Sequence, residues 1–197
     1  MKLSFAKSIS FIFNPIVALL ATAFLLTYKT TGDLHSAMSW TGYTLFFLFL
    51  ITLFILYCVR KKVFTDMDVS RREQRPLLFV VGLLAAILYL VGLIFLNGPA
   101  ILFLITFGVV IGIFFASIIN IYVKASIHVS TISALILALI FAFGGGFSSL
   151  LLLLIPLVAW SRLETKRHTL QETFLGAILG IVLSLVMYAL MRVFLIK

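Results

Sequence analysis

The sequence predicts an all-α membrane protein, a polytopic bundle of about six to seven transmembrane helices in a single domain, residues 1–197. Hydrophobic residues make up 63% of the 197 positions and charged residues only 11%. No water-soluble domain of this size has such a composition. The hydrophobic residues gather into long runs, several of them near the ~20 residues that a helix needs to cross a bilayer. No repeat or long polar linker interrupts them, so we expect one domain.

Seven apolar segments follow one another along the chain. They lie at about 10–28, 41–59, 77–96, 99–119, 129–143, 147–160 and 173–195. The first follows the basic residues Lys2 and Lys7. The third and fourth are separated by Asn97-Gly98-Pro99, a combination that predicts a tight turn.

The fifth and sixth segments are separated by three glycines, Gly144-Gly145-Gly146. Each of the two is short for a span, at ~15 residues against the ~20 expected. The alternative is one fused helix of about 30 residues, ~45 Å long. Three glycines inside a helix would each cost roughly 1 kcal/mol relative to alanine. We therefore predict a hairpin whose two short helices extend into the neighbouring polar stretches.

Three polar islands interrupt the apolar segments, and they carry most of the groups capable of chemistry. The first island is 66–76, the second is 124–130 and the third is 160–172. With seven spans, all three islands and the amino terminus fall on the same side of the membrane. A fused fifth and sixth segment would instead separate the second island from the third.

Two of the three histidines, His128 and His168, lie in these islands, whereas His35 lies outside them and receives no role. Phosphoryl transfer without a metal needs a nucleophile, an acid for the leaving oxygen and cations for the phosphate oxygens. Histidine suits either of the first two tasks. Glu172 lies four residues after His168, so a helix beginning near Thr169 puts both on one face. Its carboxylate is then placed to fix the tautomer of the imidazole.

Arginine is the side chain best suited to the phosphate oxygens, because its planar fork makes two parallel hydrogen bonds. Arg75 and Arg162 both stand at predicted membrane boundaries, where an anionic head group would lie. Arg75-Pro76 also opens a helix, a position that proline favours. The basic residues that flank other segments are interpreted as topology signals; they are Arg60, Lys61, Lys62, Lys166 and Arg167.

The third island resembles the last motif of the type 2 phosphatidic acid phosphatase superfamily of membrane phosphatases. That motif is Ser-Arg, five residues, His, three residues, Asp, then a glycine four positions later. Here the positions hold Ser161, Arg162, His168, Glu172 and Gly176. Glutamate therefore replaces the aspartate of the motif.

The other two motifs of that superfamily have weaker counterparts, in the same order along the chain. Its middle motif, Pro-Ser-Gly-His, is matched by residues 125–128, which read Ala-Ser-Ile-His and follow Lys124. Its first motif, Lys, six residues, Arg-Pro, is matched by Arg75-Pro76, but Asp68 stands at the lysine position. The resemblance covers about residues 60–180, which would form the phosphatase core.

The resemblance implies a role for each matching residue. His168 would be the nucleophile that forms a phosphohistidine, Glu172 would orient it, and His128 would be the acid on the leaving group. Phosphate would be bound by Arg75, Ser126 and Arg162. Lys124 and Arg72 are candidates to replace the missing first-motif lysine. The resemblance implies a metal-independent hydrolase with no cofactor.

The net charge of +9 bears on the binding partners of the protein and on its orientation in the membrane. The polar loops are too short for a nucleic-acid-binding module, so no nucleic-acid partner is expected. The resemblance implies that the partner is a bilayer lipid with a phosphate or diphosphate head group. All but three of the 15 Lys and Arg residues fall on the side of the islands; the exceptions are Lys29, Arg192 and Lys197. Positive residues mark cytoplasmic loops, so we predict an inner-membrane protein with its active-site loops on the cytoplasmic face.

Two alternatives remain open at this point. One is a non-catalytic membrane protein that binds lipid, because the first two motifs are altered. The other is a magnesium-dependent prenyltransferase, because Asp66-Met67-Asp68 is faintly similar to an aspartate-rich diphosphate site. Asp33 is the only further aspartate in the sequence, so a second aspartate cluster is lacking.

Overall fold

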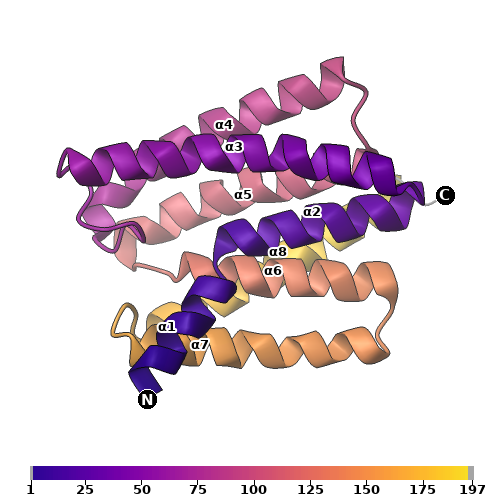
Figure 1. Ribbon diagram of the computed structural model, residues 1–197. Helices are drawn as coiled ribbons and strands as arrows, with labels where there is room; N and C mark the ends of the chain where they lie inside the picture. Colours follow the sequence, from indigo (N-terminus) through magenta and orange to yellow (C-terminus); the bar gives the residue numbers. More distant parts are fainter. Residues whose placement is uncertain (1, 195–197) are drawn as a thin grey trace. The chain divides into compact units, whose positions relative to one another are not determined.

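The computed structural model describes residues 2–194, and every regular element in that range is helical. The predicted all-α class is confirmed. Two short 3₁₀ helices, η1 and η2, accompany the α-helices (Figure 1). In chain order the elements are α1 (Lys2–Ile12), α2 (Pro15–Thr31), α3 (Leu34–Arg60), η1 (Arg72–Gln74), α4 (Arg75–Phe95), α5 (Ala100–Tyr122), α6 (Ile127–Phe143), η2 (Phe147–Leu153), α7 (Leu154–Glu164) and α8 (Leu170–Phe194).

Each of the seven predicted apolar segments coincides with a helix, although α3 begins earlier than expected and the sixth segment begins as the 3₁₀ helix η2. Residue 195, the predicted end of the last segment, lies outside the described residues. The prediction missed most of α1 and the break after it, because the first apolar segment, 10–28, begins in the last residues of α1 and continues into α2. Asn14 separates α1 from α2: its Oδ1 accepts from the Val17 N–H at 3.0 Å, and Pro15 opens α2. Proline at a first helical position is preorganised for this start.

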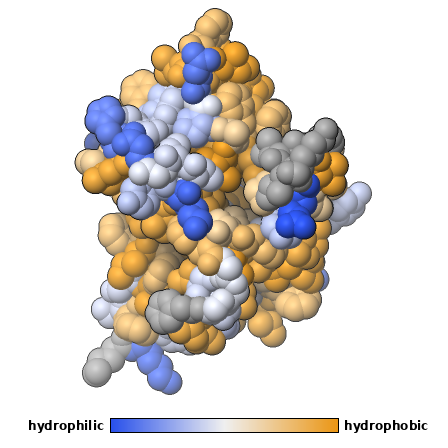
Figure 2. All heavy atoms as spheres, turned by 90° about the vertical axis from the view of Figure 1, so that its right-hand side faces the viewer, coloured by the Kyte–Doolittle hydropathy of each residue, from blue (hydrophilic) through white to orange (hydrophobic). Residues whose placement is uncertain are grey.

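The length and composition of the helices are typical of an integral membrane protein. Among the described residues, four helical stretches are apolar and long enough to cross a bilayer: Leu34–Arg60, Arg72–Phe95, Ala100–Tyr122 and Leu170–Val193. The pair α1 and α2, bent by 43°, passes the same test as one unit. Because α6 is shorter, the count of six to seven spans stays a prediction. Hydrophobic residues cover most of the face in Figure 2.

The three glycines end α6, as the sequence predicts. Gly144 has φ of 85°, a left-handed conformation that favours glycine. The chain then turns back through η2 into α7, which lies beside α6 in Figure 1. The fused 30-residue helix is therefore wrong, and the hairpin is confirmed.

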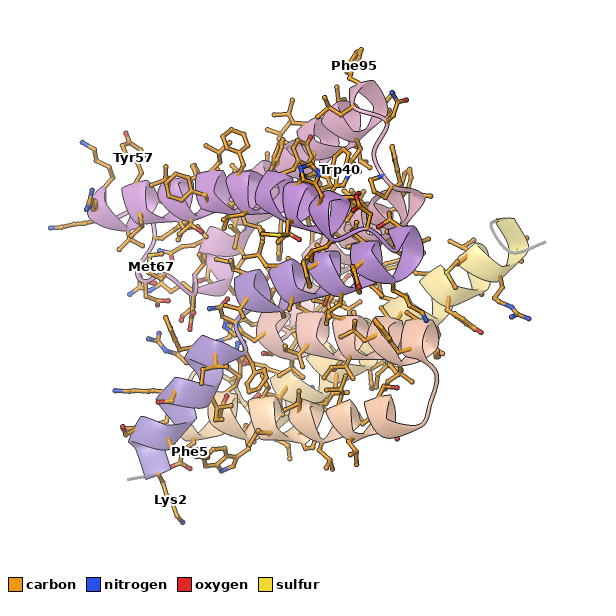
Figure 3. All side chains as sticks on the ribbon, turned by 45° about the vertical axis from the view of Figure 1, so that its right-hand side comes forward. Lys2, Phe5, Trp40, Tyr57, Met67 and Phe95 are labelled. Atoms are coloured by element: carbon orange, nitrogen blue, oxygen red, sulfur yellow. The ribbon has the colours of Figure 1, made fainter. Side chains whose placement is uncertain are left out.

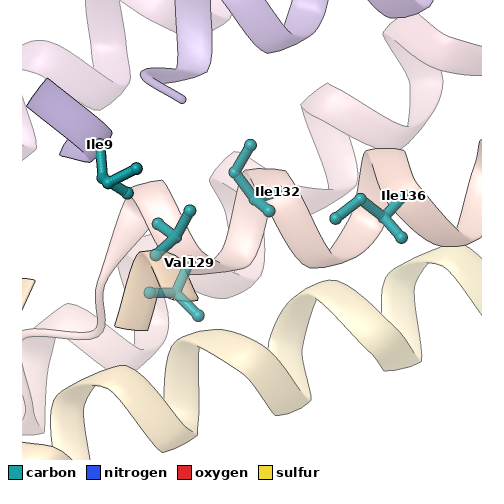
Figure 4. Close-up of a cluster of buried hydrophobic side chains, with 5 residues drawn as sticks. Ile9, Val129, Ile132 and Ile136 are labelled. Carbon is teal, nitrogen blue, oxygen red and sulfur yellow. The ribbon is translucent and has the colours of Figure 1, made fainter. Parts of the chain in front are cut away.

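The chain divides into two compact units, and each is described separately. Unit 1 comprises residues Met1–Thr22 and Val123–Lys197, and unit 2 comprises Ala23–Tyr122. The core of unit 1 joins α1, α6 and α7. Ile9 of α1 points toward Val129 of α6, beside Ile132 and Ile136 (Figure 4). Val158 of α7 belongs to the same cluster.

Helices α6 and α8 of unit 1 pack with their backbones unusually close. A Cβ added at Gly176 would lie 2.6 Å from the backbone oxygen of Ser126. A Cβ added at Gly180 would meet the backbone oxygen of Ser130 even more closely. Two glycines four residues apart present one flat helix face, the arrangement that permits close helix packing in membranes. This contact sets the position of the amino end of α6 against that of α8.

In unit 2, polar aromatic residues connect α3 to α4. The Tyr43 hydroxyl donates to the backbone oxygen of Tyr89 at 3.1 Å, and the Thr44 and Tyr89 hydroxyls lie 2.9 Å apart. Trp40 packs edge-on against Tyr43 with ring centroids 5.5 Å apart. Figure 3 shows Trp40 and Tyr57 near opposite ends of α3. Buried hydroxyls that pair in this way stabilise the contact between two spanning helices.

The predicted turn between α4 and α5 is also confirmed. Asn97 adopts a left-handed φ of 54°, and the Gly98 N–H donates to the Leu93 oxygen at 2.8 Å. This is the Schellman arrangement, in which a residue beyond the helix end satisfies a carbonyl of its last turn. A Cβ at Gly98 would lie 2.6 Å from Cδ2 of Leu93 and 3.2 Å from its Cβ, so a larger residue would require the Leu93 side chain to shift.

Candidate active site

The third island begins with a structured helix end. Lys166 has a left-handed φ of 55°, and the Lys166 N–H donates to the Leu163 oxygen at 2.9 Å. The Arg167 and His168 N–H groups both point to the Arg162 oxygen, at 3.1 and 3.3 Å. These bonds form a Schellman motif at the carboxyl end of α7. The backbone N–H groups of Arg167 and His168 are therefore both hydrogen-bonded to the end of α7.

The amino end of α8 is closed by a capping box. The Thr169 hydroxyl accepts from the Glu172 N–H at 3.3 Å, and Glu172 Oε2 accepts from the Thr169 N–H at 3.2 Å. Ser or Thr followed three residues later by Glu or Gln is the sequence signature of this motif. A negative side chain in the first turn also interacts favourably with the helix dipole. Glu172 thus has a structural role besides any chemical one.

The predicted contact between His168 and Glu172 is confirmed. His168 Nδ1 lies 2.8 Å from Glu172 Oε2, and the two side chains are only 4% and 18% exposed. A carboxylate accepts hydrogen bonds, so we assign the proton to Nδ1. This tautomer leaves the lone pair of the imidazole on Nε2. A carboxylate partner also favours a positive charge on the ring, as a phosphorylated imidazole would carry.

Lys124 of the second island reaches the same carboxylate. Its Nζ lies 3.7 Å from Glu172 Oε2 and donates to the Arg167 backbone oxygen at 2.9 Å. The side chains of the pair are 19% and 18% exposed. The second and third islands therefore meet at one end of unit 1, as predicted. Lys124 therefore places a cation beside the same carboxylate oxygen that contacts His168.

The second island continues into α6. Ser126 is fully buried, and its hydroxyl accepts from the Val129 N–H at 3.5 Å as the N-cap of the helix. The Ser126 N–H donates to the Glu172 backbone oxygen at 3.0 Å. His128 lies in the first turn of α6 and is half-buried. The Ser126 hydroxyl thus has a structural role as a helix cap. The phosphate-binding role predicted for it stays a prediction.

Arg162 lies in the last turn of α7, 3% exposed. Its Nη1 donates to the hydroxyl of Ser10 at 2.7 Å. Ser10 belongs to α1, 152 residues away in the sequence. A buried guanidinium needs hydrogen-bond partners to offset the loss of water, and α1 supplies one of them.

The two remaining predicted residues, Arg72 and Arg75, belong to unit 2. Arg72 Nη1 donates to the backbone oxygens of Ile121 and Tyr122 at 3.2 and 2.9 Å, so it caps the carboxyl end of α5. Cationic side chains stabilise exposed helix carbonyls in this way. Arg75 is buried, and its Nε donates to the Val69 oxygen at 3.3 Å. Their phosphate-binding roles stay predictions.

The aspartates of the first island form a local turn. Asp66 Oδ1 accepts from the Asp68 N–H at 2.9 Å and from the Ser70 hydroxyl at 3.0 Å. A carboxylate that bonds the backbone two residues later is the Asx-turn arrangement. Within residues 2–194, no three His, Cys, Asp or Glu side chains are grouped so that they could hold a metal ion. The comparison of this segment with an aspartate-rich diphosphate site gains no support from these contacts.

No protein-family model, curated protein or solved structure matches the chain.

The sequence prediction missed four features of this site. The capping box at Thr169 and the close packing at Gly176 and Gly180 were readable, since Thr-x-x-Glu and Gly-x-x-x-Gly are local patterns. Ser10 carries no local signal, because its partner is far away in the sequence. The contact of Lys124 with Glu172 was likewise not readable, although Lys124 itself was a candidate.

Proposed function

We propose that the protein is a membrane-embedded phosphatase that hydrolyses a lipid phosphate or prenyl diphosphate through a phosphohistidine at His168. The observation that carries the proposal is the pairing of a nearly buried imidazole with a carboxylate at 2.8 Å, with Lys124 on the same carboxylate. Hydrogen bonding through Nδ1 keeps Nε2 as the nucleophilic nitrogen. The resemblance of the three polar islands to phosphatase motifs supports the same chemistry.

The proposed reaction has two steps. In the first, His168 Nε2 attacks phosphorus, the bond to the lipid oxygen breaks, and His128 gives a proton to that oxygen. In the second, His128 takes a proton from water while the water oxygen attacks phosphorus, the P–N bond breaks and inorganic phosphate leaves. A diphosphate substrate would instead release a lipid monophosphate in the first step. Arg162 and Lys124 would neutralise the phosphate oxygens in both transition states.

The substrate would come from the bilayer. Residues 2–194 are almost entirely apolar helices and short polar loops, and the candidate site lies where these helices begin and end. A lipid head group at the membrane surface reaches such a site without leaving the bilayer. We place the protein in the inner membrane with the site on the cytoplasmic face, because most positive residues are expected on that side.

The test is phosphate release by the purified protein in excess EDTA. The panel contains phosphatidic acid, lysophosphatidic acid, a glycerophospholipid whose head group ends in a phosphate monoester, and a polyprenyl diphosphate. We expect release from at least one lipid, and a loss of about 10³-fold or more in the rate with His168→Ala. The matched control is His35→Ala, because His35 is an exposed histidine in the first turn of α3. Equal rates for wild type and His168→Ala on every lipid would refute the proposal.

The intermediate gives a second, independent readout. A substrate with labelled head-group phosphate should transfer label to wild type but not to His168→Ala, and the label should be lost in acid. Binding of the lipids without any release would favour the non-catalytic alternative. Activity that disappears in EDTA and returns with magnesium would favour the prenyltransferase.

Sidedness is tested separately by cysteine labelling. Cys58, the native cysteine, is buried, so a cysteine introduced at Thr65 or Gly32 reports its own loop. An impermeant reagent applied to intact cells should label position 32 and spare position 65. The opposite pattern would contradict a cytoplasmic site.

A further inference from the structure

Arg162, proposed to bind phosphate, is held by a helix that none of the phosphatase-like motifs includes. Its Nη1 donates to Ser10 Oγ at 2.7 Å, a short hydrogen bond for a charged donor. Serine carries no charge, so this contact orients the guanidinium without neutralising it. An aspartate in the same place would orient the arginine but compete with a phosphate for it.

The docking of α1 that delivers Ser10 is supported by several packing contacts. Ala6 is fully buried and Ile9 is 8% exposed, and Ile9 belongs to the core that also contains Val158 of α7. The rings of Phe5 and Trp160 lie 6.0 Å apart. Figure 3 shows Lys2 and Phe5 along this helix. The contacts of Phe5 and Ile9 with α7 fix the position of α1 along that helix, so Ser10 lies at a defined place beside Arg162.

The boundaries of α1 make it a helix distinct from α2, with its own direction. It ends at Ile12, and α2 begins at Pro15 after a bend of 43°. The Asn14 amide donates to the Phe11 oxygen at 2.8 Å, while its carbonyl caps α2. Both helix ends are thus satisfied at the bend, which allows α1 to leave the direction of α2 and lie against α7.

An arginine side chain has several rotatable bonds, and a ligand that must order them binds less tightly for that reason. A hydrogen bond already present before the ligand arrives removes part of that cost, which is the principle of preorganisation. We propose that Ser10 is a positioning residue that aims Arg162 at the phosphate, and that α1 is part of the substrate site. This inference rests on the proposed phosphatase function.

The test compares Ser10→Ala with Ser10→Thr, which keeps the hydroxyl. The matched control is Ser8→Ala on the same helix, since Ser8 is exposed and its hydroxyl donates to the backbone oxygen of Ser4. We expect Ser10→Ala to raise KM and the inhibition constant of inorganic phosphate by about tenfold, as for loss of a hydrogen bond to a charged group. The turnover number should change by less than about threefold. Ser10→Thr and Ser8→Ala should stay near wild type.

A double-mutant cycle separates positioning from a general structural effect. If Ser10 acts through Arg162, then adding Ser10→Ala to Arg162→Ala should leave the inhibition constant of inorganic phosphate unchanged. An equal loss in both backgrounds, accompanied by a lower melting temperature, would show that Ser10 serves stability and would overturn the inference.

The outcomes also distinguish this inference from the proposed function. If wild type releases phosphate and Ser10→Ala behaves like Ser8→Ala, only the positioning role is overturned. If wild type releases phosphate from no lipid of the panel, the phosphatase proposal fails and the positioning role falls with it.

Discussion

Replacing Gly176 with alanine would test the helix packing that brings the second and third islands together. The added Cβ would lie 2.6 Å from the Ser126 backbone oxygen, about 0.8 Å short of the 3.4 Å at which ordinary contact begins. The oxygen is part of the backbone, so it cannot rotate away as a side chain would. Ser126 also donates its N–H to the Glu172 backbone oxygen at 3.0 Å. Helices α6 and α8 must therefore separate to relieve the clash, which weakens this hydrogen bond.

The energetic consequence follows from these contacts. Overpacking costs about 1–3 kcal/mol, and a weakened buried hydrogen bond adds about 0.5–1.5 kcal/mol. Alanine returns roughly 1 kcal/mol through its higher helix propensity. We therefore expect the Gly176→Ala variant to lose about 1–3 kcal/mol of stability, which for a chain of this length lowers the melting temperature by about 2–12 °C.

The assay is thermal unfolding of the purified protein in detergent, followed by intrinsic fluorescence. The control is Gly42→Ala in α3, where an added Cβ meets no atom within 4 Å. That control should keep or raise the melting temperature, because only the propensity gain remains. A Gly176→Ala variant as stable as the Gly42→Ala variant would refute the close α6–α8 contact.

Three further substitutions distinguish the roles of single side chains. Glu172→Gln keeps a capping box with Thr169 but removes the charge, so kcat should fall about 10²-fold with KM nearly unchanged; steady-state phosphate release checks this, and a larger change in KM would contradict it. Lys166→Gly removes a left-handed non-glycine residue and should raise the melting temperature, corresponding to about 0.5–1 kcal/mol, whereas Lys166→Ala should give no gain. Arg72→Ala should lower stability by about 1 kcal/mol through loss of the α5 cap and leave KM unchanged; a raised KM at unchanged melting temperature would instead support phosphate binding.

The features that the sequence predicted correctly depend on local signals. The Gly144–Gly146 hairpin and the Asn97-Gly98 turn need particular backbone angles, and glycine and asparagine are the residues that adopt them most easily. The contact of His168 with Glu172 follows from spacing at the start of one helix. In each case the residues that cause the feature lie within a few positions of it, so the pattern is sufficient.

The features that the sequence did not predict depend on partners that are distant along the chain. The pattern Gly-x-x-x-Gly marks a close helix contact, but nothing in it names Ser126 and Ser130 as the surface opposite. Ser10 is an ordinary serine in a short helix until Arg162 is placed beside it. The helical state of residues 2–9 was missed because a stretch with two lysines and two serines lacks the continuous apolar character of a span.

Glu172 shows why a local motif and a chemical site are hard to separate from sequence alone. A capping box requires an acceptor at its third helical position, and glutamate is long enough to reach back to the Thr169 N–H. His168 directly precedes Thr169, so the same oxygen also meets the imidazole. Glutamate at this position, where the phosphatase motif that it resembles has aspartate, therefore suits the way α8 begins. Capping needs only an acceptor, whereas stabilising a positive imidazole and pairing with Lys124 need a charge. Glu172→Gln, which keeps the acceptor and removes the charge, therefore separates the capping role from the chemical role, whereas the sequence pattern is the same for both.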